Sequence, residues 1–155
     1  MKKRWIQVII AVIFIFGLLI YFQPLKLADL ANENQHIIIM HEVVHVENGI
    51  PSIASTNYNE ITEKEKNEIL GVFKEYSYRR KIGTFFSDGS LFRFGDGAVY
   101  IYVYDKDGEN FRLKNTIYVA DSKDIVVNGK TYVMNGASGF MDEILEIIQE
   151  SIKDD

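Results

Sequence analysis

An unbroken apolar run near the N-terminus constrains this chain more than any other feature. The run extends from Ile6 to Phe22 with Gln7 as its only strongly polar residue, and three basic residues (KKR, 2–4) precede it. Its length lies within the range of about 17–25 residues that a membrane-spanning helix uses, and it exceeds the core of about 7–15 residues in a signal peptide. We therefore expect residues 1–22 to form a cytoplasmic stub and a transmembrane signal-anchor helix.

The charges on either side of this run predict the orientation of the chain in the membrane. Basic residues that flank a span stay in the cytoplasm, so we expect a single-pass protein of the cell membrane with everything from about Gln23 outside. No small-x-small cleavage site follows the run, so the anchor is expected to remain uncleaved. The external part contains all 22 acidic residues and 14 of the 17 basic ones, a net charge of −8. This charge argues against a nucleic-acid partner. The expected partners are the membrane, through a single span, and an envelope or membrane protein.

The external part has to hold itself together by its core. The chain has no cysteine, which excludes disulfides, thiolate metal sites and lipid attachment through cysteine. Residues 23–35 are predicted to be a short polar tether, and residues 36–155 to be one extracytoplasmic domain.

Strand signals dominate that domain. β-branched residues are frequent over 37–46 and favour a strand, whereas the glycine and proline in 48–60 indicate a loop. From Ile82 onward apolar and polar residues alternate in short runs. Asp107-Gly108 and Asn128-Gly129 separate such runs and indicate hairpin turns. The extended segments expected after Ile82 are 84–86, 91–94, 98–104, 110–120, 125–127 and 130–133, and together they indicate a meander of about five strands.

Two amphipathic helices complete the pattern. Thr62 and Glu65 have the spacing of a capping box, and the helix that follows should end near Tyr78, where the basic trio 79–81 lies at its negative end. That trio could also dock onto acidic wall polymers or lipid headgroups. A second helix is expected over 139–152, with Ser138 as its N-cap. Consecutive strands imply an antiparallel sheet, so we predict an α+β fold with five to six strands and both helices on one face.

One pentapeptide, HEVVH at 41–45, matches the H-E-x-x-H signature of zincin metallopeptidases. On a helix His41 and His45 would be about 6 Å apart along the axis and could bind one zinc, with Glu42 as the general base. On a strand the same pair would be about 13 Å apart, too far for one ion. A site of the gluzincin type would also need a later carboxylate, for which Glu68 matches by residue type.

The surroundings of HEVVH favour the strand. Its β-branched flanks pack well on a pleated sheet, and only a short tether precedes it, whereas zincins place a sheet before this helix. In strand register the apolar face is expected to contain 38, 40, 44 and 46, and the mixed outer face 37, 39, 41, 43, 45 and 47, with Glu42 breaking the alternation. We therefore expect no cofactor, no metal and no catalytic residue. A zinc peptidase with Glu42, His41, His45 and Glu68 remains the alternative.

Three tyrosines form the other candidate site. Tyr100, Tyr102 and Tyr104 share one face of a predicted strand, and Ile101 and Val103 share the other. Such a surface is either a binding platform or the half-buried face beneath a helix. The residues leave both interpretations open.

The order of segments resembles a known class of protein. The segments are IIIMHEVVHVENG, ITEKEKNEILGVFKEY, AVYIYVYDKDGENFRLK and IVVNGKTYVM, followed by the last helix. Together they resemble small extracytoplasmic domains of unknown function in Gram-positive bacteria, which follow a single transmembrane or lipid anchor. This resemblance implies an extended HEVVH and no catalytic residues. We expect a non-enzymatic, membrane-anchored domain with an interaction, accessory or sensing role. The alternatives are the zinc peptidase and an immunity-type protein against an antibacterial peptide.

Overall fold

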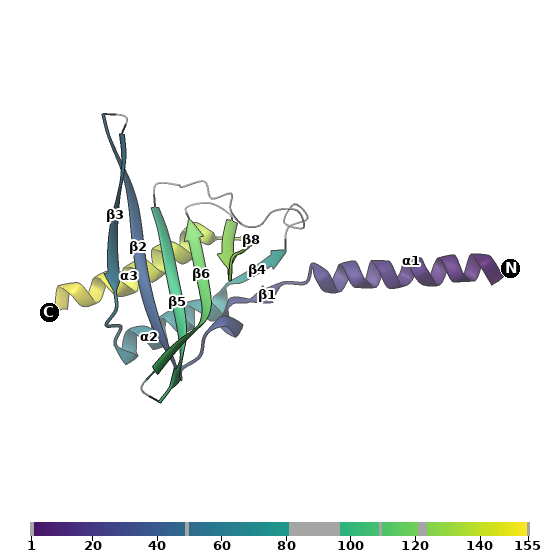
Figure 1. Cartoon of the computed structure of the whole chain (residues 1–155), viewed down its shortest axis with the longest axis horizontal. Helices are drawn as coiled ribbons and strands as arrows, with labels where there is room; N and C mark the ends of the chain where they lie inside the picture. The colour runs from purple at the N-terminus through teal and green to yellow at the C-terminus, as the bar shows by residue number, and fades with distance from the viewer. Residues whose placement is uncertain (1, 49, 81–96, 109, 121–123, 155) are drawn as a thin grey trace.

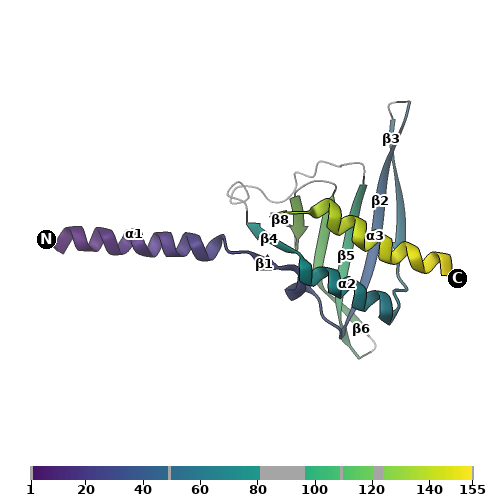
Figure 2. The same ribbon diagram turned by 180° about the vertical axis from the view of Figure 1, so that it is seen from behind.

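The computed structural model describes residues 2–48, 50–80, 97–108, 110–120 and 124–154. A long N-terminal helix leads into an α+β domain, in which two helices cover one face of an eight-stranded antiparallel sheet (Figures 1 and 2). In chain order the elements are α1 (Lys2–Tyr21), β1 (Leu25–Lys26), the 3-10 helix η1 (Leu27–Leu30), β2 (Gln35–Glu47), β3 (Ile50–Tyr58), α2 (Glu63–Glu75), β4 (Ser77–Arg80), β5 (Gly97–Asp107), β6 (Asn110–Ala120), β7 (Asp124–Val127), β8 (Lys130–Met134) and α3 (Ala137–Asp154).

Helix α1 projects away from the domain (Figure 1). Its stretch Arg4–Tyr21 has a mean hydropathy of 2.2, and none of it is buried. Twenty residues of helix extend about 30 Å, which is the thickness of the hydrocarbon core of a bilayer. The predicted apolar run therefore lies, from Ile6 to Tyr21, in a helix that is long and apolar enough to span a membrane, and its last residue, Phe22, follows the helix.

The sheet has the strand order β1-β4-β8-β7-β6-β5-β2-β3. Strands β5 to β8 follow one another as a meander, and the long β2–β3 hairpin joins this meander along β5. Helix α2 then carries the chain from β3, at one edge, across the sheet to β4 near the other edge (Figure 2). The order places β1, which follows α1, and β3 at opposite edges.

Local signals in the sequence explain several boundaries. Asn128 and Gly129 have φ angles of 51° and 75°, which are the positive values that a type I′ turn requires. Gly108 has a φ of 63° at the β5–β6 turn. At the start of α2, Thr62 accepts a hydrogen bond from the backbone N–H of Glu65, and the Glu65 carboxylate accepts one from the N–H of Thr62. The capping box and both predicted hairpins are confirmed.

The core lies between the sheet and the two helices. Phe73 of α2 and Phe140 of α3 are fully buried, with ring centroids 5.7 Å apart. Tyr76 packs edge-on against Phe140, and its hydroxyl donates to the carboxylate of Glu143 at 2.8 Å, which ties the end of α2 to α3. The buried side chains of the sheet on this face are Ile37, Ile39, Tyr78, Val99, Ile101, Val103, Ile117, Val119, Ile125, Val127 and Met134.

The predicted strand number was too low because β1, β3 and β4 arise from segments with other local signals. Strand β1 and the fully buried Leu27 come from the predicted tether. Strand β3 comes from the predicted loop. It tolerates Pro51 because it is an edge strand, where one side needs no hydrogen bonds.

Helix α2 also ends earlier than its pattern predicts. It stops at Glu75, and Tyr78 is buried in β4 opposite Met134. Arg79 and Arg80 thus belong to a strand and not to a helix end. Helix α3 starts at Ala137, so Ser138 lies inside it and is not its N-cap. The predicted strands at 84–86 and 91–94 fall outside the described residues.

We predict that Phe140→Ala lowers the free energy of unfolding by about 3–5 kcal/mol, because it leaves a cavity between α2 and α3. Phe111→Ala is the matched control, because Phe111 is 55% exposed and its loss should cost less than about 1 kcal/mol. Urea unfolding of the full chain in detergent micelles, followed by circular dichroism, measures both. Equal losses in the two variants would contradict this description of the core.

Candidate functional site: the helix-free face of the sheet

The HEVVH segment lies in the middle of β2. Its first residue, His41, is paired with Val99 of β5 on one side and with Thr56 of β3 on the other. The backbone is therefore extended through the whole motif, as predicted. His41 and His45 are four residues apart along a strand, which separates their Cα atoms by about 13 Å.

The alternation of the strand also separates the glutamate of the motif from both histidines. His41 and His45 point to the face of β2 that contains Ile37 and Ile39, which are 1% and 0% exposed. Glu42 points to the opposite face. A general base has to reach the water on the metal that the histidines hold, and here it would lie on the other side of the sheet.

This burial corrects the predicted assignment of faces. The face with Ile37, Ile39 and His41 is the inner face under the helices, and the face with Ile38 and Met40 is the outer one. The reason is that both faces carry apolar residues, so the pattern alone does not determine which one the helices cover.

The remaining residue of the alternative zinc site lies on a different element. Glu68 is on α2, where its side chain is 45% exposed and forms an ion pair with Lys64 at 3.8 Å. Among the residues that the structure describes, no group of three His, Cys, Asp or Glu side chains is arranged to hold a metal ion. The structure therefore does not bring Glu68 together with the two histidines.

The three predicted tyrosines lie on the face of the sheet that α2 and α3 leave uncovered. Tyr100, Tyr102 and Tyr104 are half-buried, whereas Ile101 and Val103 between them are fully buried on the helix side. No described helix covers these tyrosines. We call this surface the tyrosine face; it comprises Ile38, Met40 and Glu42 of β2, Tyr100, Tyr102 and Tyr104 of β5, and Thr116 and Tyr118 of β6.

Contacts between aromatic rings fix the positions of side chains on the tyrosine face. The rings of Tyr100 and Tyr102 are stacked, with centroids 6.4 Å apart and planes within 7°. Tyr100 also contacts the ring of Tyr118 on β6 at 4.6 Å. Next to them, Ala98, Ala120 and Val126 form a small buried cluster with Tyr118. The tyrosines are thus held by neighbours from three strands, which reduces the side-chain entropy that binding would cost.

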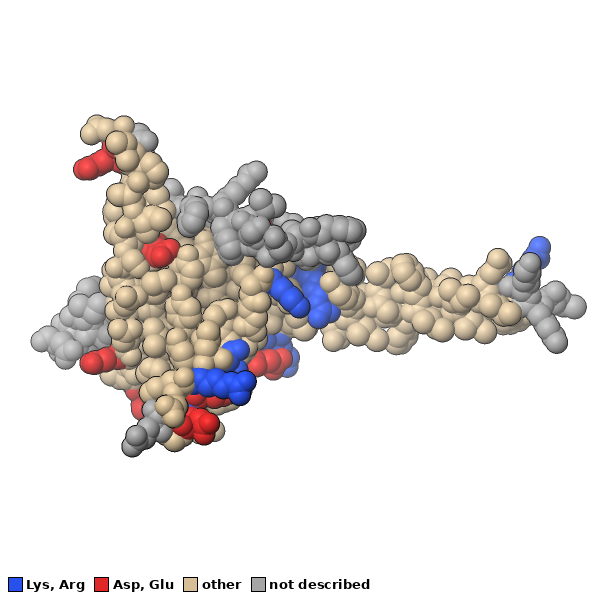
Figure 3. Space-filling model, in the orientation of Figure 1, with Lys and Arg blue, Asp and Glu red and all other residues tan. Residues whose placement is uncertain are grey.

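Glu42 lies among these rings. Burial raises the pKa of Tyr100, and the hydrogen bond that its hydroxyl donates to the Glu42 carboxylate raises it further. Burial is also the main cause of the raised pKa of Tyr102 and Tyr118, with a smaller effect of Glu42. These phenols are therefore neutral donors at physiological pH. Around them, most of the surface in this view carries no charge, and many of the charged side chains gather toward the lower end of the sheet and the base of α1 (Figure 3).

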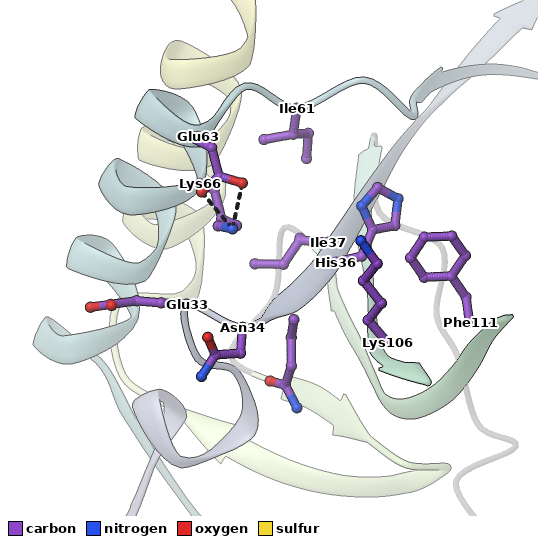
Figure 4. A pocket seen from close by; sticks show the side chains of 10 residues that line it. Glu33, Asn34, His36, Ile37, Ile61, Glu63, Lys66, Lys106 and Phe111 are labelled. Carbon is purple, nitrogen blue, oxygen red and sulfur yellow. Dashed lines mark hydrogen bonds and ion pairs between the residues drawn. The ribbon is translucent and has the colours of Figure 1, made fainter. Parts of the chain in front are cut away.

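A cavity of about 270 Å³ lies where β2 begins, between the start of α2 and the β5–β6 hairpin. Figure 4 shows His36 and Phe111 on one side of it and Lys66 and Glu63 of α2 on the other. Lys66 is 9% exposed, and its ammonium group pairs with the Glu63 carboxylate at 2.7 Å. The ring of Phe111 is 5.0 Å from that of His36. The lining carries both signs of charge and its buried cation has its own counter-ion, so the cavity shows no preference for one ligand class.

The sequence contained no signal for this cavity, since its residues are far apart along the chain. No protein family model, no curated protein and no solved structure matches the chain.

We predict that His41 destabilises the fold as the pH falls. Burial lowers the pKa of His41 in the folded protein below its ordinary value of about 6.5. The unfolded chain therefore binds this proton more tightly than the folded protein does. The resulting loss of folding stability is absent above about pH 6.5 and grows as the pH falls below it. Between pH 7.5 and 5 the free energy of unfolding should fall less in His41→Gln than in the parent chain.

Urea unfolding at the two pH values measures this difference. His45→Gln is the matched control, because His45 is an exposed position on the same face of the same strand. An equal pH dependence in the parent and in His41→Gln would contradict the prediction.

Proposed function

We propose that the chain is a non-enzymatic, membrane-anchored extracytoplasmic protein that binds a protein partner in the cell envelope through its tyrosine face. The observation that carries the proposal is the half-exposed row of tyrosines on the sheet face that no described helix covers. Tyrosine is enriched at protein interfaces because its ring buries a large apolar area while its hydroxyl can still hydrogen-bond. Ile38 and Met40 extend the apolar part of this surface along β2.

The placement outside the membrane rests on α1 and on the charges around it. The apolar helix follows three basic residues, which favour a cytoplasmic N-terminus. The domain that follows is acidic. The resemblance to small extracytoplasmic domains supports the same placement.

The geometry of HEVVH argues against the zincin arrangement. Two histidines about 13 Å apart and a glutamate on the opposite face do not form the zincin arrangement. No contact between the described residues favours the zinc peptidase or an immunity-type protein over a binding function.

Site-specific photo-crosslinking tests the proposal in cells. A photoreactive phenylalanine analogue in place of Tyr102 should give a discrete crosslinked product with an envelope protein. The same analogue in place of Glu68 is the matched control, because Glu68 is partly exposed on α2, on the helix side of the sheet. Tyr100→Ala should weaken the product at 102, because it removes the ring stacked on that position.

Two outcomes would contradict the proposal. One is a product that forms equally well from positions 102 and 68, or from neither. The other is one zinc ion per purified chain that is lost in His41→Ala, which would support the peptidase instead.

A further inference from the structure

The fold places three basic side chains beside the external end of α1. Strand β1 begins four residues after α1 ends, and it pairs with β4 through Leu25 with Tyr78 and Lys26 with Ser77. This pairing brings the end of β4 to the end of the helix. We call Lys26, Arg79 and Arg80 the juxtamembrane basic cluster.

Arg80 contacts α1 directly. Its Nη1 donates to the backbone carbonyl of Tyr21 at 3.2 Å, and its guanidinium carbon is 4.4 Å from the centre of the Tyr21 ring. The carbonyl belongs to the last turn of the helix, where a positive charge is favourable. A guanidinium has five N–H donors in a planar fork, so the same side chain can also donate to a phosphate oxygen.

Lys26 and Arg79 lie next to each other on the helix-free face. Lys26 is opposite Ser77, and Arg79 is two residues further along β4, which makes the two side chains diagonal neighbours on the same face. Both are exposed, and neither forms an ion pair with another described residue. Two acidic residues of the described part of the chain are placed near β4: Asp29, whose charge acts on Tyr78, and Asp124, two strands away from Arg79 in register.

The depth of the cluster matches that of lipid phosphates. The span Arg4–Tyr21 fills most of the hydrocarbon core of a bilayer, so Tyr21 and Phe22 lie where aromatic side chains collect at the membrane surface. Side chains that contact Tyr21, or that follow it within a few residues, then lie among the headgroups. An arginine fork binds phosphate oxygens in pairs.

The distance of these basic residues from α1 along the sequence is also compatible with a location at the outer headgroups. Basic residues within about 15–20 positions of a span oppose its translocation. Lys26 is within that distance of α1, whereas Arg79 and Arg80 are far beyond it and reach the membrane surface only when β4 pairs with β1. The fold can therefore place two arginines at the outer headgroups without reversing the orientation of the anchor.

We infer that the juxtamembrane basic cluster binds the phosphate groups of anionic phospholipids in the outer leaflet. This inference rests on the proposed membrane anchorage. It counters, at one edge, the repulsion between an external part with a charge of −8 and an anionic surface. It also orients the domain: β1 and β4 face the lipid, and β3, seven strand spacings or about 33 Å away, is at the far edge.

Quenching by spin-labelled lipids tests the inference in the full chain. Because the chain has no cysteine, Ser77→Cys carries a single fluorophore next to Lys26. The protein is reconstituted in vesicles of phosphatidylcholine with 30% phosphatidylglycerol, and a small fraction of either lipid carries a nitroxide high on its acyl chain. We expect stronger quenching by labelled phosphatidylglycerol than by labelled phosphatidylcholine, and a smaller difference in 0.5 M salt.

Charge variants identify the residues that are responsible. Lys26→Gln with Arg79→Gln should lower the preference for phosphatidylglycerol, by about five-fold in binding constant for each charge removed. Arg79→Lys should retain most of it. Lys106→Gln with Arg112→Gln is the matched control, because it removes two exposed charges at the β5–β6 hairpin and should have no effect.

Equal quenching by the two labelled lipids in the parent chain would overturn the inference. So would an equal loss of the preference for phosphatidylglycerol in the two double variants. Extraction of the same vesicles with alkaline carbonate keeps this outcome separate from the anchorage. A chain that resists extraction but shows no lipid preference refutes only the basic cluster. A chain that is released refutes the anchorage on which the inference rests.

Discussion

The pairing of β2 with β3 and β5 is the constraint on which the candidate site depends. Nine residues of β2 pair with β5, and nine, partly the same ones, pair with β3. Residues 39–43 are paired on both sides and the other residues of β2 on one side, so the strand is extended and its side chains alternate between the two faces over its length. That alternation buries Ile37 and Ile39 under the helices and sends Glu42 to the side opposite His41. It also places Ile38 and Met40 beside Tyr102 and Tyr100.

The strand order also connects the proposed anchor with the proposed binding surface. One sheet runs from β1, next to α1, to β3 at the far edge, and the tyrosine face lies on β2, β5 and β6, away from the anchor. A cluster of basic residues lies at the near edge and an aromatic surface lies further out, and our proposal assigns the first to the membrane and the second to a protein partner. The two surfaces have different chemistry, one cationic and one aromatic, and we propose a different partner for each.

Much of the fold could be predicted from local signals, because those features are set by neighbouring residues. Thr62 and Glu65 are sufficient to start α2, Asn128 and Gly129 to turn a hairpin, and the β-branched residues of β2 to favour an extended backbone. The apolar run from Ile6 to Phe22 likewise indicates a long helix by its composition alone.

The sequence-based predictions are wrong where contacts with residues far away in the sequence determine the secondary structure or the buried face. Ser77–Arg80 forms a strand because β1 and β8 lie on its two sides, although the preceding residues are helical. Ile50–Tyr58 contains a proline and few apolar residues, and it is extended because β2 offers it a long edge. The faces of β2 were reversed for the same reason, since Ile37 and Ile38 are equally apolar and only the packing of α2 and α3 distinguishes them.

The central claim is that β2 is extended and turns its even-numbered residues to the tyrosine face. Single cysteines at 37, 38, 39 and 40 test it directly, because the chain has none of its own. Alkylation of the folded full chain by a charged maleimide should be fast at 38 and 40 and slow at 37 and 39. Fast reaction at 37 and 39 with protection at 38 and 40, or similar rates at all four positions, would contradict the account.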